Sequence, residues 1–166
     1  MKQYRFIIVY VVLAAVQVVL CNFLNLSRFA VLSFLPALVL MLPVRFGNIT
    51  MMLLAFATGF AVDFFSTGML GLSSLALVPV ALGRNFLIDI LFGEELGARE
   101  GELSLTRFGF PKFVLVTLQL CMLYFLLYIW ADAAGTMGFW ACVLRFVLSV
   151  LVSTPVCVLV AHILRP

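Results

Sequence analysis

Asp63, Arg84 and Arg145 are charged residues inside long apolar segments of this sequence. A charged side chain at the centre of a bilayer costs at least about 2.5–3.5 kcal/mol, so each needs a compensating contact in the folded protein. For Asp63 three roles are open. It can pair with a cation, it can carry a proton or bind a substrate, or it can cap the turn at Ser66-Thr67-Gly68 and face the outer water.

Depth in the membrane makes Arg145 the candidate partner of Asp63. Under the spans assigned below, Asp63 lies near the outer end of the third span, and Arg145 lies about two turns into the sixth from the same side. Opposite charges at one depth lower each other's cost. We therefore expect an Asp63–Arg145 contact that fixes how these two spans pack. Arg84 is expected to extend its charge to the inner membrane surface.

Residues for catalysis are scarce in the rest of the sequence. The single histidine, His162, falls near the inner end of the last apolar run, where it is expected to face lipid headgroups. The sequence has no nucleophile elbow, His-Glu-x-x-His site or aspartate cluster for lipid-phosphate transfer. The cysteines lack metal-ligand spacing and are expected to be buried thiols; they are Cys21, Cys121, Cys142 and Cys157. We predict no enzyme, no catalytic residue, no metal and no cofactor.

The composition places these residues in a membrane protein. Hydrophobic residues make up 66% of the chain and charged residues 10%, with a mean hydropathy of +1.27. A soluble domain averages about 45–50% apolar and about 25% charged residues. Long unbroken apolar runs indicate helices rather than barrel strands. The predicted fold class is therefore an all-α integral membrane protein, with residues 1–166 forming one transmembrane domain. The net charge of +3 requires no nucleic-acid partner.

The apolar runs predict a compact bundle of six transmembrane helices. They are expected at approximately 6–24, 29–44, 49–65, 69–85, 113–131 and 139–164. Pro36 is expected to kink the second span, and the fourth is expected to continue toward Phe92 along the membrane surface. The polar segment 93–111 is either a solvated cytoplasmic loop or a docking loop for a cytoplasmic partner.

Positive charges set the predicted orientation, because Lys and Arg accumulate in cytoplasmic loops. One side of the six-span arrangement receives Arg28 and Arg145. The other side receives Lys2, Arg5, Arg45, Arg84, Arg99, Arg107, Lys112 and Arg165. Both termini lie on this second side, so both are predicted to be cytoplasmic.

The stretch from Ala55 to Arg84 organises the predicted bundle. Ala55, Gly59 and Asp63 recur every four residues and therefore share one helix face. The Ala55–Gly59 spacing lets another helix backbone come close. Gly71 and Ser74 share a face at the start of the next span. The pattern predicts a tightly packed helical hairpin that buries one acid.

This stretch resembles the bacterial rod shape-determining protein MreD family. The family is recognised by a glycine, an aspartate one turn later, and a Leu-Gly-Leu run that opens the next helix. Gly59, Asp63 and residues 70–72 match that pattern, which covers about a tenth of the chain. The length, the near absence of soluble loops and a second span bearing Pro36 and Pro43 also agree.

The resemblance implies a non-enzymatic subunit of the cell-elongation (rod) complex in the bacterial inner (cytoplasmic) membrane. Its expected partner is an MreC-like bitopic membrane protein and, through it, MreB, RodA and a class B penicillin-binding protein in side-wall peptidoglycan synthesis. The implied fold is similar to the substrate-binding subunit of energy-coupling-factor transporters. A vitamin-type binding subunit is the alternative function, which the few polar groups on the outer side disfavour. The resemblance supplies no role for Arg145.

Overall fold

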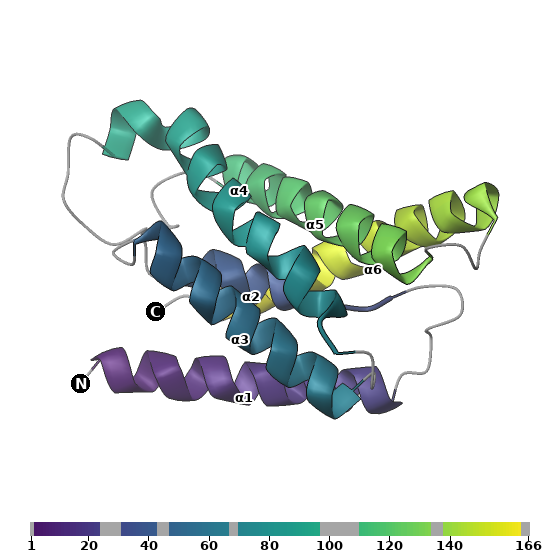
Figure 1. The fold of residues 1–166 in the computed structure, drawn as a ribbon. Helices are drawn as coiled ribbons and strands as arrows, with labels where there is room; N and C mark the ends of the chain where they lie inside the picture. The colour runs from purple at the N-terminus through teal and green to yellow at the C-terminus, as the bar shows by residue number, and fades with distance from the viewer. Residues whose placement is uncertain are drawn as a thin grey trace.

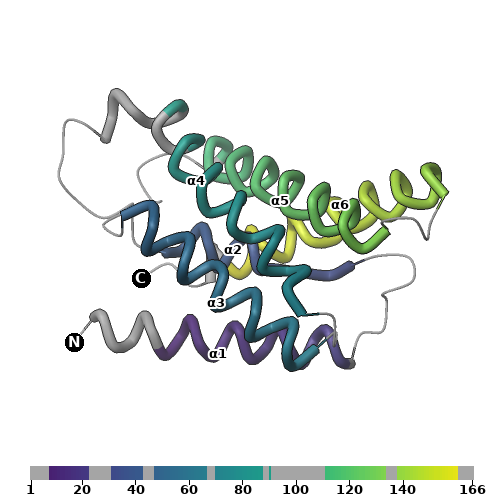
Figure 2. Tube along the Cα trace, in the orientation of Figure 1, coloured from purple at the N-terminus to yellow at the C-terminus, as the bar shows by residue number. Residues whose placement is uncertain are grey.

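The computed structural model describes the backbone of residues 2–23, 31–42, 47–66, 70–96, 110–133 and 138–163 (Figure 1). Side chains are described for residues 8–22, 31–42, 47–66, 70–87, 90, 111–133 and 138–160 (Figure 2). The described part of the chain is all-helical, as predicted. Its helices are α1 (Lys2–Phe23), α2 (Leu35–Met41), α3 (Asn48–Ser66), α4 (Leu72–Leu96), α5 (Phe110–Asp132) and α6 (Phe139–Ile163) (Figure 1).

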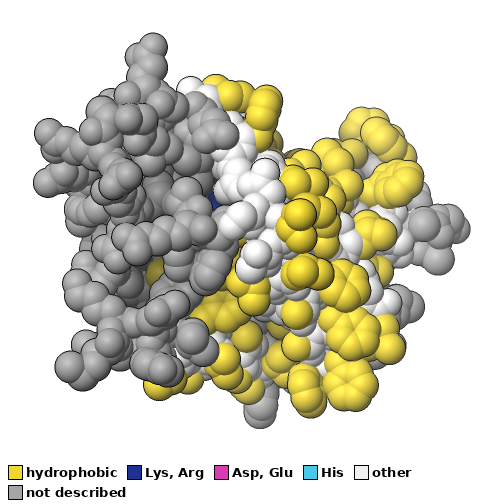
Figure 3. All heavy atoms as spheres, turned by 60° about the vertical axis from the view of Figure 1, so that its left-hand side comes forward, with side chains coloured by type: hydrophobic (Ala, Val, Ile, Leu, Met, Phe, Trp, Pro, Cys, Tyr) yellow, Lys and Arg dark blue, Asp and Glu magenta, His cyan; other side chains and the backbone are white. Residues whose placement is uncertain are grey.

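Among the residues whose side chains are described, three helical segments are long and apolar enough to cross a membrane: Asn48–Ser66, Pro111–Asp132 and Phe139–Val160. Shorter apolar segments, Ile8–Asn22 and Leu72–Leu87, lie in α1 and α4. Hydrophobic side chains cover much of the described surface in Figure 3. An extensive apolar surface is unfavourable in water and favourable in lipid. The apolar helices and this surface therefore indicate a membrane-embedded protein.

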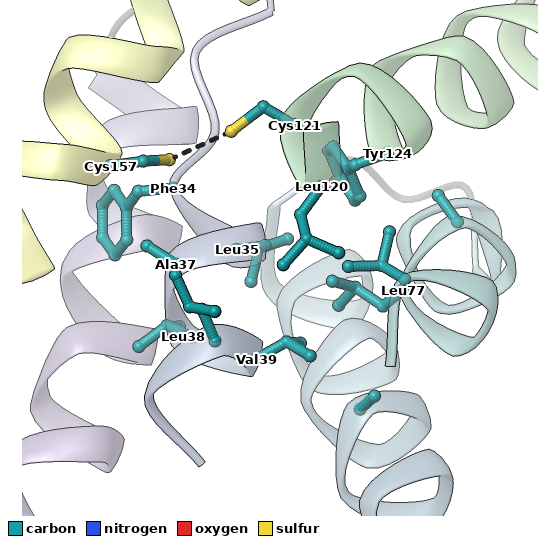
Figure 4. Packing of buried hydrophobic residues seen from close by; sticks show 14 of the residues in the cluster. Phe34, Leu35, Ala37, Leu38, Val39, Leu77, Leu120, Cys121, Tyr124 and Cys157 are labelled. Atoms are coloured by element: carbon teal, nitrogen blue, oxygen red, sulfur yellow. Dashed lines mark hydrogen bonds between the residues drawn. The ribbon is translucent and has the colours of Figure 1, made fainter. Parts of the chain in front are cut away.

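The short helix α2 is the centre of the fold. It contacts each of the other five helices, and its residues Leu35 to Leu40 are buried (Figure 1). Leu35 meets Leu77 of α4 and Leu120 of α5 in the core (Figure 4). Around this centre α3 packs on α4, α4 on α5 and α5 on α6, while α1 lies against α3. Lipid tails are as apolar as these side chains, so close packing, rather than removal from water, holds the core together.

The prediction of a helical second span at 29–44 is wrong in its first part. Residues 31–34 are not helical, and the helix occupies only Leu35–Met41, a length of about 10 Å. Pro36 lies in the first turn of α2 instead of kinking a longer helix. Proline suits that position because the N–H that it lacks would have no partner in the first turn of a helix. Residues 29, 30, 43 and 44 lie outside the described residues.

The other helix bounds agree with the predicted spans to within a few residues at most ends. Helix α4 is one continuous helix of 25 residues through Pro79 to Leu96, so the predicted continuation past 85 toward Phe92 is confirmed and exceeded by about one turn. Its path along the membrane surface stays a prediction. The predicted loop 93–111 is therefore helical at both of its ends. The rest of that loop and the turn residues Thr67 and Gly68 lie outside the described residues. So do five of the ten positive charges used to predict orientation, namely Arg28, Arg45, Arg99, Arg107 and Arg165.

Candidate functional site

The Asp63 carboxylate lies where α3 gives way to α4. It is fully buried, and its Oδ2 accepts hydrogen bonds from the backbone N–H groups of Gly71, at 3.0 Å, and Ser73, at 2.8 Å. These amides belong to the start of α4, where N–H groups have no partner within their own helix. A negative charge is favourable there because the helix dipole is positive at that end. Asp63 therefore caps the helix that follows its own.

Two glycines allow the α3–α4 corner to close. A Cβ on Gly59 would lie 2.7 Å from both Cα and N of Ser74, so the backbones of α3 and α4 touch where only glycine fits. Ser74 Oγ also donates to the carbonyl of Phe56, at 3.2 Å. Gly71 has a φ of +98°, a conformation that other residues rarely adopt. The predicted hairpin that buries one acid is confirmed, and Gly59, Asp63 and Gly71 come together in it. We call these three residues the Asp63 corner.

The predicted contact between Asp63 and Arg145 is wrong. Arg145 Nη1 lies 2.6 Å from Oδ2 of Asp132, near the end of α5, and both side chains are largely buried. Among the described elements α3 does not pack against α6, whereas α5 and α6 are neighbours joined by a short connection. Asp132, which the sequence analysis did not single out, is therefore the acid within reach of Arg145. The alternative that Asp63 caps the turn at Ser66-Thr67-Gly68 stays a prediction, because Thr67 and Gly68 lie outside the described residues. The expectation that Asp63 faces water is wrong, because it is fully buried.

Arg84 does not extend to the membrane surface as predicted. Its side chain is fully buried, and its Nε donates to the carbonyl of Leu40, at 3.2 Å. One of its Nη groups donates to the carbonyl of Leu42, and the other to the sulfur of Met51, at 3.1 Å. Leu40 and Leu42 lie at the end of α2, where carbonyls lack partners within the helix. A cation suits the negative end of that helix dipole, so Arg84 caps the C-terminus of α2.

The non-helical segment 31–34 obtains hydrogen bonds from α1. Gln17 Oε1 accepts from the N–H of Phe34, at 3.0 Å, and Gln17 Nε2 donates to the carbonyl of Leu32, at 3.3 Å. Irregular backbone at membrane depth is tolerated only where protein or water satisfies it. A single buried glutamine thus stands in for two of the hydrogen bonds that a helix would have made.

Serines of α6 satisfy the same segment from the opposite side. Ser149 Oγ accepts from the N–H of Val31, at 2.9 Å, and Ser153 Oγ accepts from the N–H of Ser33, at 3.2 Å. Arg145, Ser149 and Ser153 recur every four residues and are all buried on one face of α6. The sequence analysis did not single out Gln17, Ser149 or Ser153. The signal that could have found them was the recurrence of polar residues within apolar runs.

A small cavity adjoins this segment. Its volume is about 20 Å³, which is room for a water molecule. Its lining combines polar residues from several helices with a few apolar ones: Gln17, Cys21, Val31, Ser33, Leu35, Val62, Ser66, Ser73, Tyr124 and Tyr128. The fully buried hydroxyl of Tyr124 has no hydrogen-bond partner among the described residues. The cavity fits water and is much too small for a cofactor.

The chemistry that these groups perform is structural. Asp63 and Arg84 each satisfy a helix end, and Arg145 joins the end of α5 to α6. The described side chains include no cluster of three or more metal-ligating groups, and the side chain of His162 lies outside them. All four cysteines are free thiols, with Cys121 and Cys157 buried and their sulfurs 3.6 Å apart (Figure 4).

Comparison with known proteins adds no relative: no family model, no curated protein and no solved structure matches this chain.

Proposed function

We propose that this chain is a non-enzymatic integral membrane subunit of the bacterial cell-elongation complex, of the MreD type. In this proposal the six helices form a compact bundle that crosses the inner membrane six times, with both termini in the cytoplasm. The segment 31–34 and α2 together make up the second crossing. The arrangement is proposed to be similar to the substrate-binding subunit of energy-coupling-factor transporters, and its direct partner is an MreC-like bitopic protein.

The Asp63 corner is the observation that carries this proposal. The residues on which the resemblance rests, Gly59, Asp63 and Gly71, are the residues that hold α3 against α4. A stretch that serves to fix the shape of a helix pair suits a protein whose role is to present surfaces to other proteins. The motif is thus explained by packing and capping, without a substrate.

The buried charges support the same proposal. Asp63, Arg84 and Arg145 each contact backbone or a neighbouring side chain of this chain. Intramembrane ionisable residues often mark substrate or proton pathways, but a structural use of these three accounts for each of them. Large exposed apolar side chains on α1, α3, α5 and α6 also leave broad surfaces for other membrane helices.

The alternative of a vitamin-type binding subunit finds no support in the cavity beside segment 31–34. Pockets for small organic ligands measure about 300–1,000 Å³, and this cavity measures about 20 Å³. Two of the polar side chains around it, Gln17 and Ser33, already bond to the backbone of this chain. A vitamin would need several such groups free to converge on it.

Affinity purification separates the two functions. The tagged chain is expressed in a rod-shaped bacterium that lacks its own homologous subunit, solubilised in mild detergent and purified, and its co-purifying proteins and small molecules are identified by mass spectrometry. We expect a bitopic membrane protein with a large periplasmic domain, together with restoration of rod shape. Asp63→Ala should reduce both, whereas Ser66→Ala, at the end of the same helix, should reduce neither. A stoichiometric vitamin without a bitopic partner would refute the proposal.

A further inference from the structure

The amide side chain of Gln119 lies on the outer surface of α5, close to the middle of its apolar segment. It is exposed, and it is the ninth residue of the 22-residue segment Pro111–Asp132. At 1.5 Å per residue it lies about 4 Å along the helix axis from the centre of that segment. A bilayer core is about 30 Å thick, so the short glutamine side chain reaches neither headgroup region. No hydrogen bond joins its amide to the described part of the chain.

The exposed neighbours of Gln119 follow the spacing of a helix–helix interface. Leu115, Gln119, Met122 and Leu126 are separated by four, three and four residues, and the three apolar ones are 47%, 42% and 56% exposed. Spacings that alternate between four and three residues, and so repeat every seven, are typical of the seam of a left-handed helix pair. We call these four residues the α5 seam.

Nothing in the described fold covers the α5 seam. Among the described elements α5 packs only against α2, α4 and α6, and the buried side of α5 faces them (Figure 1). Lipid solvates the leucines and the methionine of the seam well. It offers no hydrogen bond to the glutamine, and an amide left unbonded in hydrocarbon costs free energy.

We propose that the α5 seam is the interface of a homodimer, in which the Gln119 amides of two copies bond to each other. Two copies inserted in the same orientation are related by a two-fold axis along the membrane normal, so their α5 helices run parallel. This symmetry places Gln119 opposite Gln119 at equal depth. Each amide has a donor and an acceptor, so the pair can form two reciprocal hydrogen bonds. A single polar residue in an otherwise apolar seam also fixes register and oligomeric state.

Depth favours a second copy over a helix of another protein. A foreign helix would need its own hydrogen-bonding side chain within a few ångströms of the bilayer centre, facing α5. A second copy supplies that group at the matching depth by symmetry alone. The inference does not depend on the proposed cell-elongation function, because a dimer could form with or without an MreC-like partner.

The proposal can be tested by measuring energy transfer between fluorescently tagged copies of the full chain in lipid vesicles. The protein-to-lipid ratio is lowered stepwise, and the loss of energy transfer reports the strength of association. Interhelical hydrogen bonds in membranes have modest strength, so Gln119→Leu should weaken association about threefold to tenfold. Gln119→Asn keeps an amide and should retain most of the association. Leu151→Ala, on the exposed surface of α6 and also near mid-segment, is the matched control and should have no effect.

A photo-cross-linking amino acid at position 122 should join two copies of this chain in native membranes, and the same group at position 151 should not. Three results would overturn the proposal: a wild-type chain that stays monomeric at the highest protein-to-lipid ratio, a Gln119→Leu variant that associates like wild type, or cross-links from position 122 that reach only a different protein. The last result would assign the α5 seam to a heterologous membrane helix.

Discussion

Removing the Asp63 carboxylate should destabilise the fold through two backbone amides. In Asp63→Ala the N–H groups of Gly71 and Ser73 lose the acceptor that lies 3.0 and 2.8 Å away. A buried donor left without a partner costs about 1–3 kcal/mol. Ser73 is buried and Gly71 is half-buried, so Gly71 can recover part of its loss by bonding to water. We therefore expect Asp63→Ala to lower the free energy of unfolding by about 3–4 kcal/mol.

The isosteric variant Asp63→Asn separates hydrogen bonding from charge. Its side-chain oxygen can still accept from both amides, so it loses only the additional strength that a charged acceptor provides. Removing a buried charge also relieves a desolvation cost, which opposes this loss. The expected decrease for Asp63→Asn is about 1–2 kcal/mol. If Asp63 served instead as one half of an ion pair, the loss would follow charge, and Asn would be about as harmful as Ala.

The buried thiols provide the assay for this prediction. Cys121 and Cys157 are inaccessible in the folded protein, so a thiol-reactive dye should label them only on unfolding. Titration with SDS in mixed micelles, followed by this labelling, gives the free energy of unfolding for each variant. Ser66→Ala, which removes a hydroxyl that donates to the carbonyl of Val62, is the control and should cost less than about 1 kcal/mol. The reasoning is refuted if Asp63→Ala costs no more than this control.

Three further predictions use the same assay. Gly59→Ala should lower the free energy of unfolding by about 3 kcal/mol or more, since its Cβ would meet the α4 backbone. Gly83→Ala should lower it by less than about 1 kcal/mol, because its Cβ meets only a flexible leucine side chain at 3.1 Å. Equal losses for the two variants would contradict this prediction. Arg84→Ala should lower the free energy of unfolding by about 3 kcal/mol. Arg84→Lys should lose a large part of the same amount, because one ammonium cannot reach the separate carbonyls at the end of α2. A lysine variant as stable as wild type would contradict this prediction. A double-mutant cycle of Arg145→Ala and Asp132→Asn should give a coupling energy of about 1–2 kcal/mol, and a value near zero would show that the 2.6 Å pair is not stabilising.

The helices and the α3–α4 hairpin could be predicted from sequence because their signals are local. A run of apolar residues specifies a helix wherever the chain goes, and the four-residue recurrence of Ala55, Gly59 and Asp63 specifies which face packs. Residues that act across a single tight turn, such as Gly71, are also close in sequence. The Asp63 corner could therefore be predicted without knowing which other helices lie nearby.

The partners of Arg84 and Arg145 could not be predicted in this way. Matching Arg145 to Asp63 by depth assumed that their helices were neighbours, whereas α6 packs on α5 and reaches Asp132. Arg84 lies in the predicted fourth helix, but its target is a set of carbonyls that lack helical partners because α2 ends after seven residues. The partners of both arginines depend on which helices are neighbours and where they end, and the spacing of residues along the sequence does not give this information.

The irregular second segment and the buried polar residues explain one another. A chain that leaves the helical conformation inside lipid exposes donors and acceptors, and each must be satisfied by another part of the protein. Gln17 from α1 and the serines of α6 do this for residues 31–34, and Arg84 does it for the end of α2. The signs of the charges agree with this use, since the acid lies at a helix N-terminus and the cation at a helix C-terminus. Gln119 is an exposed amide that makes no hydrogen bond to the described part of the chain, and for that reason its partner is to be sought outside the chain.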